Sequence, residues 1–326
     1  MATTFYSEIA DNKRDSVLLT LVVGALLGVL GFAIGYALTA RPEGAIGVTL
    51  VAIAVAGLLS IGSYFGGDQL VLSASQAQPV DAASAPQLMN VVQELAIAAN
   101  VPMPKVYVIE DSAPNAFATG RDPEHASVAV TTGLLDKLDR EELQGVIGHE
   151  MSHVRNFDVR FTLLVAVLVG SVALLADMFL RYSFWFGGGR GRSDREGRGG
   201  GGLQAILFVV AIVLAILAPI AARLVQLAVS RRREYLADAS SVELTRNPHG
   251  LERALAKIAA DPDVLEVANR ATQHLYFTNP IKKWEERASG LFSTHPPIVD
   301  RINRLRQLTG EQPLTPDAVS ALQGLD

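Results

Sequence analysis

The sequence predicts a membrane protein of the α+β class, mainly helical, with up to four transmembrane helices and a globular part that contains a small β-sheet. The first observation is composition: 49% of the 326 residues are hydrophobic, 19% are charged, and the mean hydropathy is +0.28. Such a chain is too apolar for an ordinary soluble enzyme. The second observation is that four apolar segments alternate with stretches of soluble composition.

The first two apolar segments predict a helical hairpin. Residues 16–40 carry no charge and are long enough to span a bilayer. A short connection leads to a second uncharged run, residues 44–67. Lys13 and Arg14 precede the first segment, whereas only Arg41 follows it, which predicts a cytoplasmic N-terminus. After two crossings, the next part of the chain is predicted to be cytoplasmic as well.

Residues 68–160 have the composition of a soluble domain. Ser84 and Gln87 have the spacing of a helix capping box, and apolar residues then recur at helical intervals until the chain reaches Pro102. β-branched content predicts strands at residues 105–110, 115–120 and 127–132.

The main chemical signal is the pattern H-E-x-x-H, formed by His149, Glu150 and His153. Asp139 and Glu142 have the spacing of a capping box, which predicts that the motif lies in a helix. Two histidines four residues apart share a helix face and can bind one zinc ion. Glu150 would then accept a proton from the attacking water. Because the chain has no cysteine, any zinc must be held by histidine and carboxylate, a set typical of catalytic sites.

The strand predicted at 115–120 has a use beside such a site. An exposed edge strand binds an extended peptide through main-chain hydrogen bonds and can lay the scissile bond across the metal. For Asn115 and Ala116, a turn into an ordinary strand is an equally good interpretation.

Residues 161–180 and 203–222 are the third and fourth apolar segments. If groups on both sides of this hairpin bind one metal, the two segments must cross the membrane twice or not at all. The linker between them, residues 187–202, is rich in glycine and arginine, and its arginines favour the cytoplasmic side. The sequence therefore leaves open whether these two segments span.

Glu234 and Asp238 follow the fourth segment and share a helix face at a spacing of four. One carboxylate can bind the metal while the other accepts a hydrogen bond from a ligand histidine. A pair of acids on a solvated helix is the alternative. The upstream H-E-x-x-H and the return of the chain through a hairpin favour metal binding.

These features together resemble the HtpX family of integral-membrane zinc metalloproteases. The shared features are four apolar segments, Asn-Ala-Phe at 115–117, H-E-x-x-H, the later Glu-x-x-x-Asp, and a late His-Pro-Pro with an arginine six residues after the histidine. The resemblance implies a zincin-like protease domain with one Zn²⁺ per chain. It also implies an endopeptidase of the cell (inner) membrane that faces the cytoplasm and degrades misfolded or damaged membrane proteins as part of the stress response.

Carried over by position, His149, His153 and Glu234 match the family's zinc ligands and Glu150 its general base. Asp238 matches the carboxylate that supports a ligand histidine.

The resemblance also implies substrate-binding residues. Asn115 and Ala116 match the family's substrate-binding edge strand, while His295 and Arg301 match late positions that help bind substrate or the oxyanion.

The predicted organisation has four parts. Residues 1–67 form an N-terminal tail and transmembrane hairpin, and residues 68–160 form the first part of the protease domain. Residues 161–229 form the second hydrophobic hairpin, and residues 230–326 complete the protease domain with the third zinc ligand.

Two other functions fit the same residues. One is a prenyl-protein processing protease, and the other is a non-catalytic membrane scaffold with a structural metal site. The expected partners are polypeptide substrates, especially membrane proteins, and the lipid bilayer. A net charge of −5 and a pI near 5.7 give no electrostatic support for a nucleic-acid partner.

Overall fold

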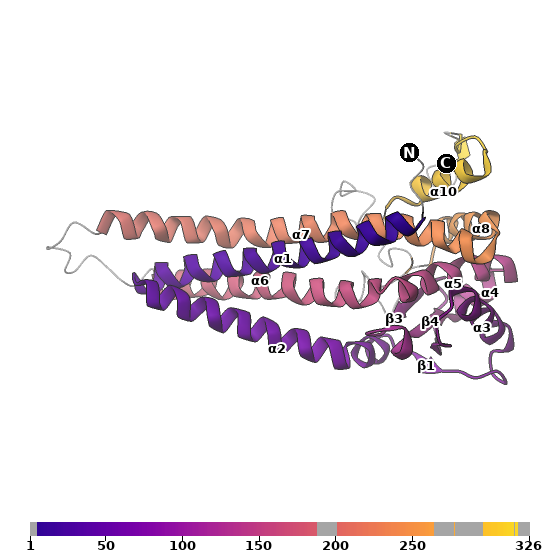
Figure 1. Ribbon diagram of the computed structural model, residues 1–326, viewed down its shortest axis with the longest axis horizontal. Helices are drawn as coiled ribbons and strands as arrows, with labels where there is room; N and C mark the ends of the chain where they lie inside the picture. The colour runs from indigo at the N-terminus through magenta and orange to yellow at the C-terminus, as the bar shows by residue number, and fades with distance from the viewer. Residues whose placement is uncertain (1–4, 188–200, 264–276, 278–295, 316, 319–326) are drawn as a thin grey trace. The chain divides into compact units, whose positions relative to one another are not determined.

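The structure is a computed structural model, and it describes residues 5–187, 201–263, 277, 296–315 and 317–318 (Figure 1). The elements along the described chain are α1 (Phe5–Thr39), α2 (Pro42–Ala74), β1 (Gln78–Pro79), α3 (Pro86–Ala99), β2 (Lys105–Ile109), β3 (Ala116–Thr119), η1 (Pro123–His125), β4 (Ser127–Thr131), α4 (Thr132–Lys137), α5 (Arg140–Arg155), α6 (Asp158–Gly187), α7 (Gly201–Thr245), α8 (Pro248–Ala260) and α10 (Ile298–Thr309).

Four of the described helices are long and apolar enough to cross a membrane, which confirms the four predicted segments. The candidate spans are Thr20–Thr39, Pro42–Ala74, Leu164–Phe184 and Ala205–Thr245. Many of their aliphatic side chains are exposed on the protein itself, as side chains that face lipid would be.

The chain divides into two compact units by its internal contacts. The first, here called the sheet unit, comprises residues 1–12, 65–161 and 229–326. The second, the helical unit, comprises residues 13–64 and 162–228. Each sequence-predicted site residue belongs to the sheet unit, so the site can be described within that unit alone.

The sheet has four strands in the order β1-β2-β4-β3 (Figure 1). Strands β2 and β4 run parallel, with Lys105 opposite Ser127, and β3 runs antiparallel to β4, with Phe117 opposite Ala129. Because β3 is the last strand in this order, it lies at an edge of the sheet. Three of the strands lie within the predicted ranges, while the two-residue β1 was not predicted.

Helix α5 is held between the sheet and other helices of the same unit. It packs against β3, α3 and α8. Its residues Leu143, Val146 and Ile147 are fully or almost fully buried, as is Phe117 on β3. Burial of each such side chain contributes about 1.5–3 kcal/mol, so the hydrophobic core fixes the helix that carries the H-E-x-x-H motif.

The start of α5 is the predicted capping box. The N–H of Glu142 donates to Asp139 Oδ1 at 2.9 Å, and the N–H of Asp139 donates to Glu142 Oε2 at 2.8 Å. Both bonds satisfy backbone groups that a helix start leaves unpaired.

The capping box predicted for α3 is wrong. The helix begins at Pro86 and has no side-chain cap. Ser84 instead donates from its Oγ to Asp81 Oδ1 at 2.9 Å, and its N–H donates to the same oxygen at 2.9 Å. A proline suits the first turn of a helix because its φ is fixed and it has no N–H to satisfy, so Ser84 belongs to the preceding turn.

Two glycines let other helices approach α5 closely. A Cβ on Gly145 would lie 2.6 Å from the backbone nitrogen of Leu251 on α8, and one on Gly148 would lie 2.8 Å from Ser241 Oγ on α7. The Ser241 hydroxyl also donates to the Gly145 carbonyl at 2.6 Å. These contacts bring α7 close to the turn of α5 that immediately precedes His149.

Candidate active site

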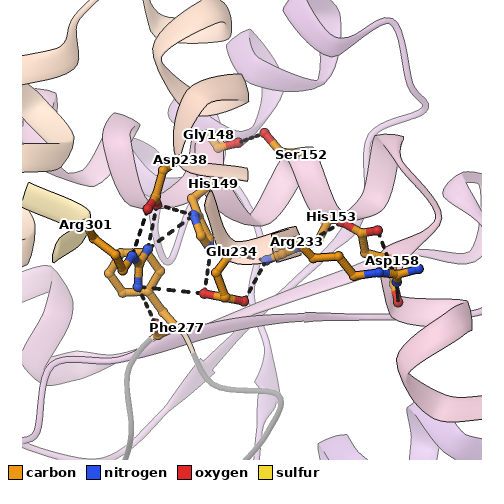
Figure 2. Close-up of polar contacts among 10 residues, drawn as sticks. All are labelled: Gly148, His149, Ser152, His153, Asp158, Arg233, Glu234, Asp238, Phe277 and Arg301. Atoms are coloured by element: carbon orange, nitrogen blue, oxygen red, sulfur yellow. Dashed lines mark hydrogen bonds and ion pairs between the residues drawn. The ribbon is translucent and has the colours of Figure 1, made fainter. Parts of the chain in front are cut away.

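Two helices supply the central side chains of the site. Helix α5 carries His149, Glu150 and His153, and α7 carries Glu234 and Asp238. His149 is fully buried, and Glu150, Glu234 and Asp238 are each less than a tenth exposed. Figure 2 shows Glu234 between the two histidines of the motif.

The donor atoms of His149, His153 and Glu234 have the spacing of a metal site. The two Nε2 atoms lie 3.1 Å apart. From Nε2 of His149 to Glu234 Oε2 is 3.6 Å, and from Nε2 of His153 to Glu234 Oε1 is 3.5 Å. Zinc bonds of about 2.0–2.1 Å in tetrahedral geometry separate neighbouring ligand atoms by about 3.3 Å. The two distances to Glu234 end on different carboxylate oxygens, and one donor atom from each residue lies within 4.8 Å of the other two. The three residues could therefore hold one cation together and leave a further position for water or substrate.

Each histidine is oriented by a carboxylate at its other ring nitrogen. Asp238 Oδ1 lies 2.9 Å from Nδ1 of His149, and Asp158 Oδ2 lies 3.0 Å from Nδ1 of His153. A hydrogen bond at Nδ1 leaves the lone pair of Nε2 free to bind a metal. The sequence predicted the first carboxylate, but not Asp158.

Each of these carboxylates is in turn held by a buried arginine (Figure 2). Arg301, which is fully buried, donates from Nη2 and Nε to Asp238 at 2.7 and 2.9 Å. Arg233 Nη1 lies 3.1 Å from Asp158 Oδ1. Hydrogen bonds between charged partners are shorter and stronger than neutral ones. The buried guanidinium of Arg301 lies beside His149 and fixes Asp238. A role of Arg301 in binding substrate or the oxyanion stays a prediction.

Phe277 is a contact that the sequence did not predict. Its ring meets His149 edge-on with centroids 4.9 Å apart, and Arg301 lies 4.6 Å above the same ring. Its N–H donates to the Ala116 carbonyl at 2.7 Å, and its own carbonyl accepts from Arg301 Nη1 at 3.1 Å. A lone aromatic residue outside any motif gives no sequence signal for such contacts.

Glu150 lies between the metal ligands and the edge strand. The backbone N–H of Ala118 on β3 donates to its carboxylate. Burial raises the pKa of Glu150 above its ordinary value, and although the two histidines lower it, the net shift is upward. Such a carboxyl group takes up a proton more readily than an exposed glutamate does.

Asn115 and Ala116 lie at the start of β3, and both are almost fully buried. The N–H of Asn115 donates to Thr131 Oγ1 at 2.9 Å, and the N–H of Ala116 donates to Asn115 Oδ1 at 3.0 Å. The Asn115 side chain thus accepts a hydrogen bond from the backbone of its own strand. Ala116 is the first residue of the edge strand β3, and Asn115 directly precedes it. Their role in substrate binding stays a prediction.

The pKa values of both histidines are raised by their acidic neighbours. Burial alone would lower the pKa of His149, but its interactions with Asp238 and Glu234 outweigh that effect. Burial is again the largest single effect for His153, yet Asp158 and Glu234 raise its pKa well above the ordinary histidine value. Without a metal, the carboxylates of the site therefore stabilise protonated histidines.

His295 lies outside the described residues, so the structure does not place it.

A second cluster, His249, Glu252 and Glu311, has donor atoms close enough for a metal. There, however, the guanidinium of Arg306 lies 2.9 Å from Glu252 and 3.4 Å from Glu311, so both carboxylates already pair with a basic side chain.

Comparison with known proteins identifies relatives of this chain. The model of the family described as Peptidase family M48 matches residues 82–309. Relatives named Protease HtpX homolog occur in Streptococcus uberis, with 43% identity over 304 residues, and in Streptococcus gordonii, with 44% identity over 303 residues. In both comparisons the match covers 93% of this chain and 99% of the relative.

A solved structure is also similar, the crystal structure of S. mikatae Ste24p. It has a TM-score of 0.47 and 16% sequence identity, and the match covers 92% of this chain and 67% of that one.

The resemblance to the HtpX family is thus confirmed. The family model spans most of the sheet unit as well as α6 and α7, and the relatives align over nearly their whole length. The chain belongs to peptidase family M48 and is a membrane metalloprotease.

Proposed function

We propose that this protein is a zinc-dependent endopeptidase of the cell membrane that hydrolyses misfolded or damaged membrane proteins, with its active site facing the cytoplasm. One observation carries the proposal: His149, His153 and Glu234 bring donor atoms within 4.8 Å of one another, close enough to hold one metal ion, beside a buried glutamate and an edge strand. The same arrangement explains how a peptide would be held and where a proton would go.

His149, His153 and Glu234 would hold the zinc. When bound, zinc supplies a Lewis acid that polarises the scissile carbonyl and activates water at neutral pH. Two imidazoles and one carboxylate leave a ligand position open, as in other catalytic zinc sites.

Glu150 acts as the general base. Its carboxylate accepts the proton of the attacking water and then delivers it to the amine that leaves. Its position beside the proposed zinc ligands suits this role, because a general base must lie within hydrogen-bond reach of the proton that it accepts. The hydrogen bond from Ala118 N–H supports the assignment because it turns the carboxylate toward the strand on which a peptide would lie.

The outer edge of β3 would bind the substrate main chain. The Ala116 carbonyl already accepts a hydrogen bond from the Phe277 N–H, which supports the proposal that a peptide amide fits at this edge. Main-chain recognition gives affinity with little sequence preference. That property suits an enzyme whose substrates share misfolding rather than a sequence. His295 stays a prediction as an oxyanion-binding or substrate-binding residue.

The membrane location supports the choice of substrate class. The chain has four candidate spans, and α7 continues from its apolar part to Glu234 as one helix. Lys13 and Arg14 before the first span support a cytoplasmic N-terminus and, after two crossings, a cytoplasmic sheet unit.

The proposal is tested with protein purified in detergent, comparing the wild type with Glu150→Gln. Cleavage of casein and of a destabilised membrane protein is measured, and bound zinc is quantified in both proteins. We expect about one zinc per chain in each, with cleavage only by the wild type. Full activity of Glu150→Gln would remove Glu150 from the mechanism, and absence of zinc from the active wild type would overturn the zinc assignment.

A further inference from the structure

Each histidine of the proposed zinc site contacts a carboxylate, and that carboxylate in turn contacts a buried arginine. The second of these series, His153–Asp158–Arg233, contains two residues that no motif singled out. We propose that Asp158 and Arg233 act as one positioning unit for His153, with Arg233 acting through Asp158. This inference rests on the proposed zinc site.

Asp158 has the geometry of an orienting group. It is 2% exposed, and its two oxygens are divided between two partners: Oδ2 lies 3.0 Å from His153 Nδ1, and Oδ1 lies 3.1 Å from Arg233 Nη1. A carboxylate at Nδ1 selects the tautomer in which the Nε2 lone pair faces the metal. His153 Nε2 is indeed the atom that lies near Glu234.

A sharp corner between α5 and α6 places Asp158 beside the histidine. Helix α5 ends at Arg155, α6 begins at Asp158, and Phe157 between them has a φ of 60°. This left-handed conformation is unfavourable for a residue with a bulky side chain. The strained corner turns the chain so that Asp158, the first residue of α6, lies beside His153, two residues before the end of α5.

Arg233 connects this carboxylate to the third ligand. It is the neighbour of Glu234 in α7 and is 5% exposed. Besides Oδ1, its Nη1 also contacts the Asp158 backbone carbonyl at 3.1 Å, and its guanidinium lies 3.7 Å above the Phe161 ring. A planar guanidinium can stack and donate at once, which lysine cannot reproduce. One carboxylate thereby joins α5, α6 and α7 at the site (Figure 2).

The pair should act on metal binding more than on folding. A buried ion pair contributes little net stability, because desolvation offsets the attraction, whereas removal of one partner leaves a buried charge unpaired. Replacing both partners together should therefore leave the fold intact while it removes the orientation of His153. This difference separates a positioning role from a structural one.

The test uses the full-length protein as Asp158→Asn, Arg233→Met, the double variant and a control, Glu243→Gln. Glu243 pairs with Arg155 at 3.0 Å between the same two helices, α5 and α7, without contacting a histidine. Zinc affinity is measured by chelator competition, the absorption spectrum is measured with Co²⁺, and the unfolding temperature is measured without metal.

We expect Asp158→Asn and Arg233→Met each to bind zinc about 10–100-fold more weakly and to shift the Co²⁺ spectrum. Because Arg233 acts through Asp158, the zinc affinity of the double variant should be no lower than that of whichever single variant binds zinc less tightly. The double variant should also unfold near the wild-type temperature. Glu243→Gln should match the wild type in affinity and spectrum.

Several outcomes would overturn the positioning unit. One is an unchanged zinc affinity in Asp158→Asn, and another is a double variant in which the two losses of zinc affinity add. A third is a double variant that does not fold, or whose unfolding temperature falls in step with its zinc affinity. If a single variant does not fold, the double variant, which buries no unpaired charge, decides. A wild type that neither binds zinc nor cleaves would instead overturn the proposed function itself.

Discussion

His149 is enclosed by groups that define how its ring can be used. Asp238 lies at Nδ1, the edge-on ring of Phe277 covers one side, and His153 Nε2 lies 3.1 Å from its Nε2. Two imidazole nitrogens at this distance must share a proton or a cation, because two lone pairs would repel. The nearby carboxylates stabilise either a proton or a metal ion between the two rings, so protons and metal compete for the site.

This competition predicts how pH changes stability. Both histidine pKa values are raised, and so is that of Glu150. A raised pKa means that the folded protein binds protons that the unfolded chain has already lost. The stabilising effect of these protons is complete below the pKa of the group in the unfolded chain, and it is lost as pH rises through the pKa of the group in the folded protein. The unfolding temperature of the metal-free protein should therefore fall as pH rises above about 6.5, the ordinary histidine pKa.

Zinc should reverse the trend, because binding requires deprotonated ligands. The difference in unfolding temperature between zinc-loaded and chelator-treated protein should increase with pH over the same range. Scanning fluorimetry in detergent measures both series. A metal-free protein that becomes more stable as pH rises would show that these groups are not protonated as their surroundings imply.

At the scale of elements, α5 depends on close approach to its neighbours. Gly145 and Gly148 face α8 and α7, respectively, where added side-chain atoms would meet the chain. The position of the H-E-x-x-H motif relative to Glu234 is thus set by helix packing as well as by the strand beneath.

We expect Gly145→Ala to destabilise the protein by about 1–3 kcal/mol, as overpacking of a tight interface typically does. The new Cβ would lie 2.6 Å from a backbone nitrogen of α8, which cannot rotate away. Gly170→Ala in α6 is the matched control, because no atom lies within 4 Å of its Cβ position and alanine favours helices. Unfolding temperatures in detergent measure both, and equal values would mean that α8 shifts freely to accommodate the methyl group.

Local patterns predicted most elements well. The capping box at Asp139 and Glu142 and the three strands depend on residues near one another in sequence, and the structure contains them. The exception, the Ser84 cap, failed because a neighbouring Asp81 offered the serine another hydrogen bond. Competition between two local solutions cannot be resolved from spacing alone.

Contacts between distant segments were harder to predict. Asp238 was found because it shares a helix face with Glu234, while Asp158, Arg233 and Phe277 reach the site through the α5–α6 corner and contacts with remote residues. Arg301 was found by resemblance, yet its burial against Asp238 follows only from the tertiary structure. Residue types predicted the chemistry, and long-range packing decided which group supports which ligand.

At the scale of the whole molecule, the open question from the sequence is how many helices cross the membrane. The structure contains four helices with suitable length and composition. Length and composition do not give direction, and the basic residues of the chain oppose one another: Lys13 and Arg14 favour a cytoplasmic N-terminus, whereas the arginines of linker 187–202 favour a cytoplasmic linker.

The absence of cysteine makes the topology directly measurable. We expect Ser84→Cys, in the sheet unit, to react with a membrane-impermeant maleimide only after the cells are opened, and Ser193→Cys, in the linker, to react in intact cells. This pattern follows if the first two helices and then α6 and α7 each cross as a pair, since His153 and Glu234 must return to one side to meet. A protected Ser193→Cys would mean that α6 and α7 do not cross, whereas an accessible Ser84→Cys would place the active site outside the cytoplasm. The cysteine-free wild type is the background control, and retained cleavage activity in each variant shows that the labelled protein is folded.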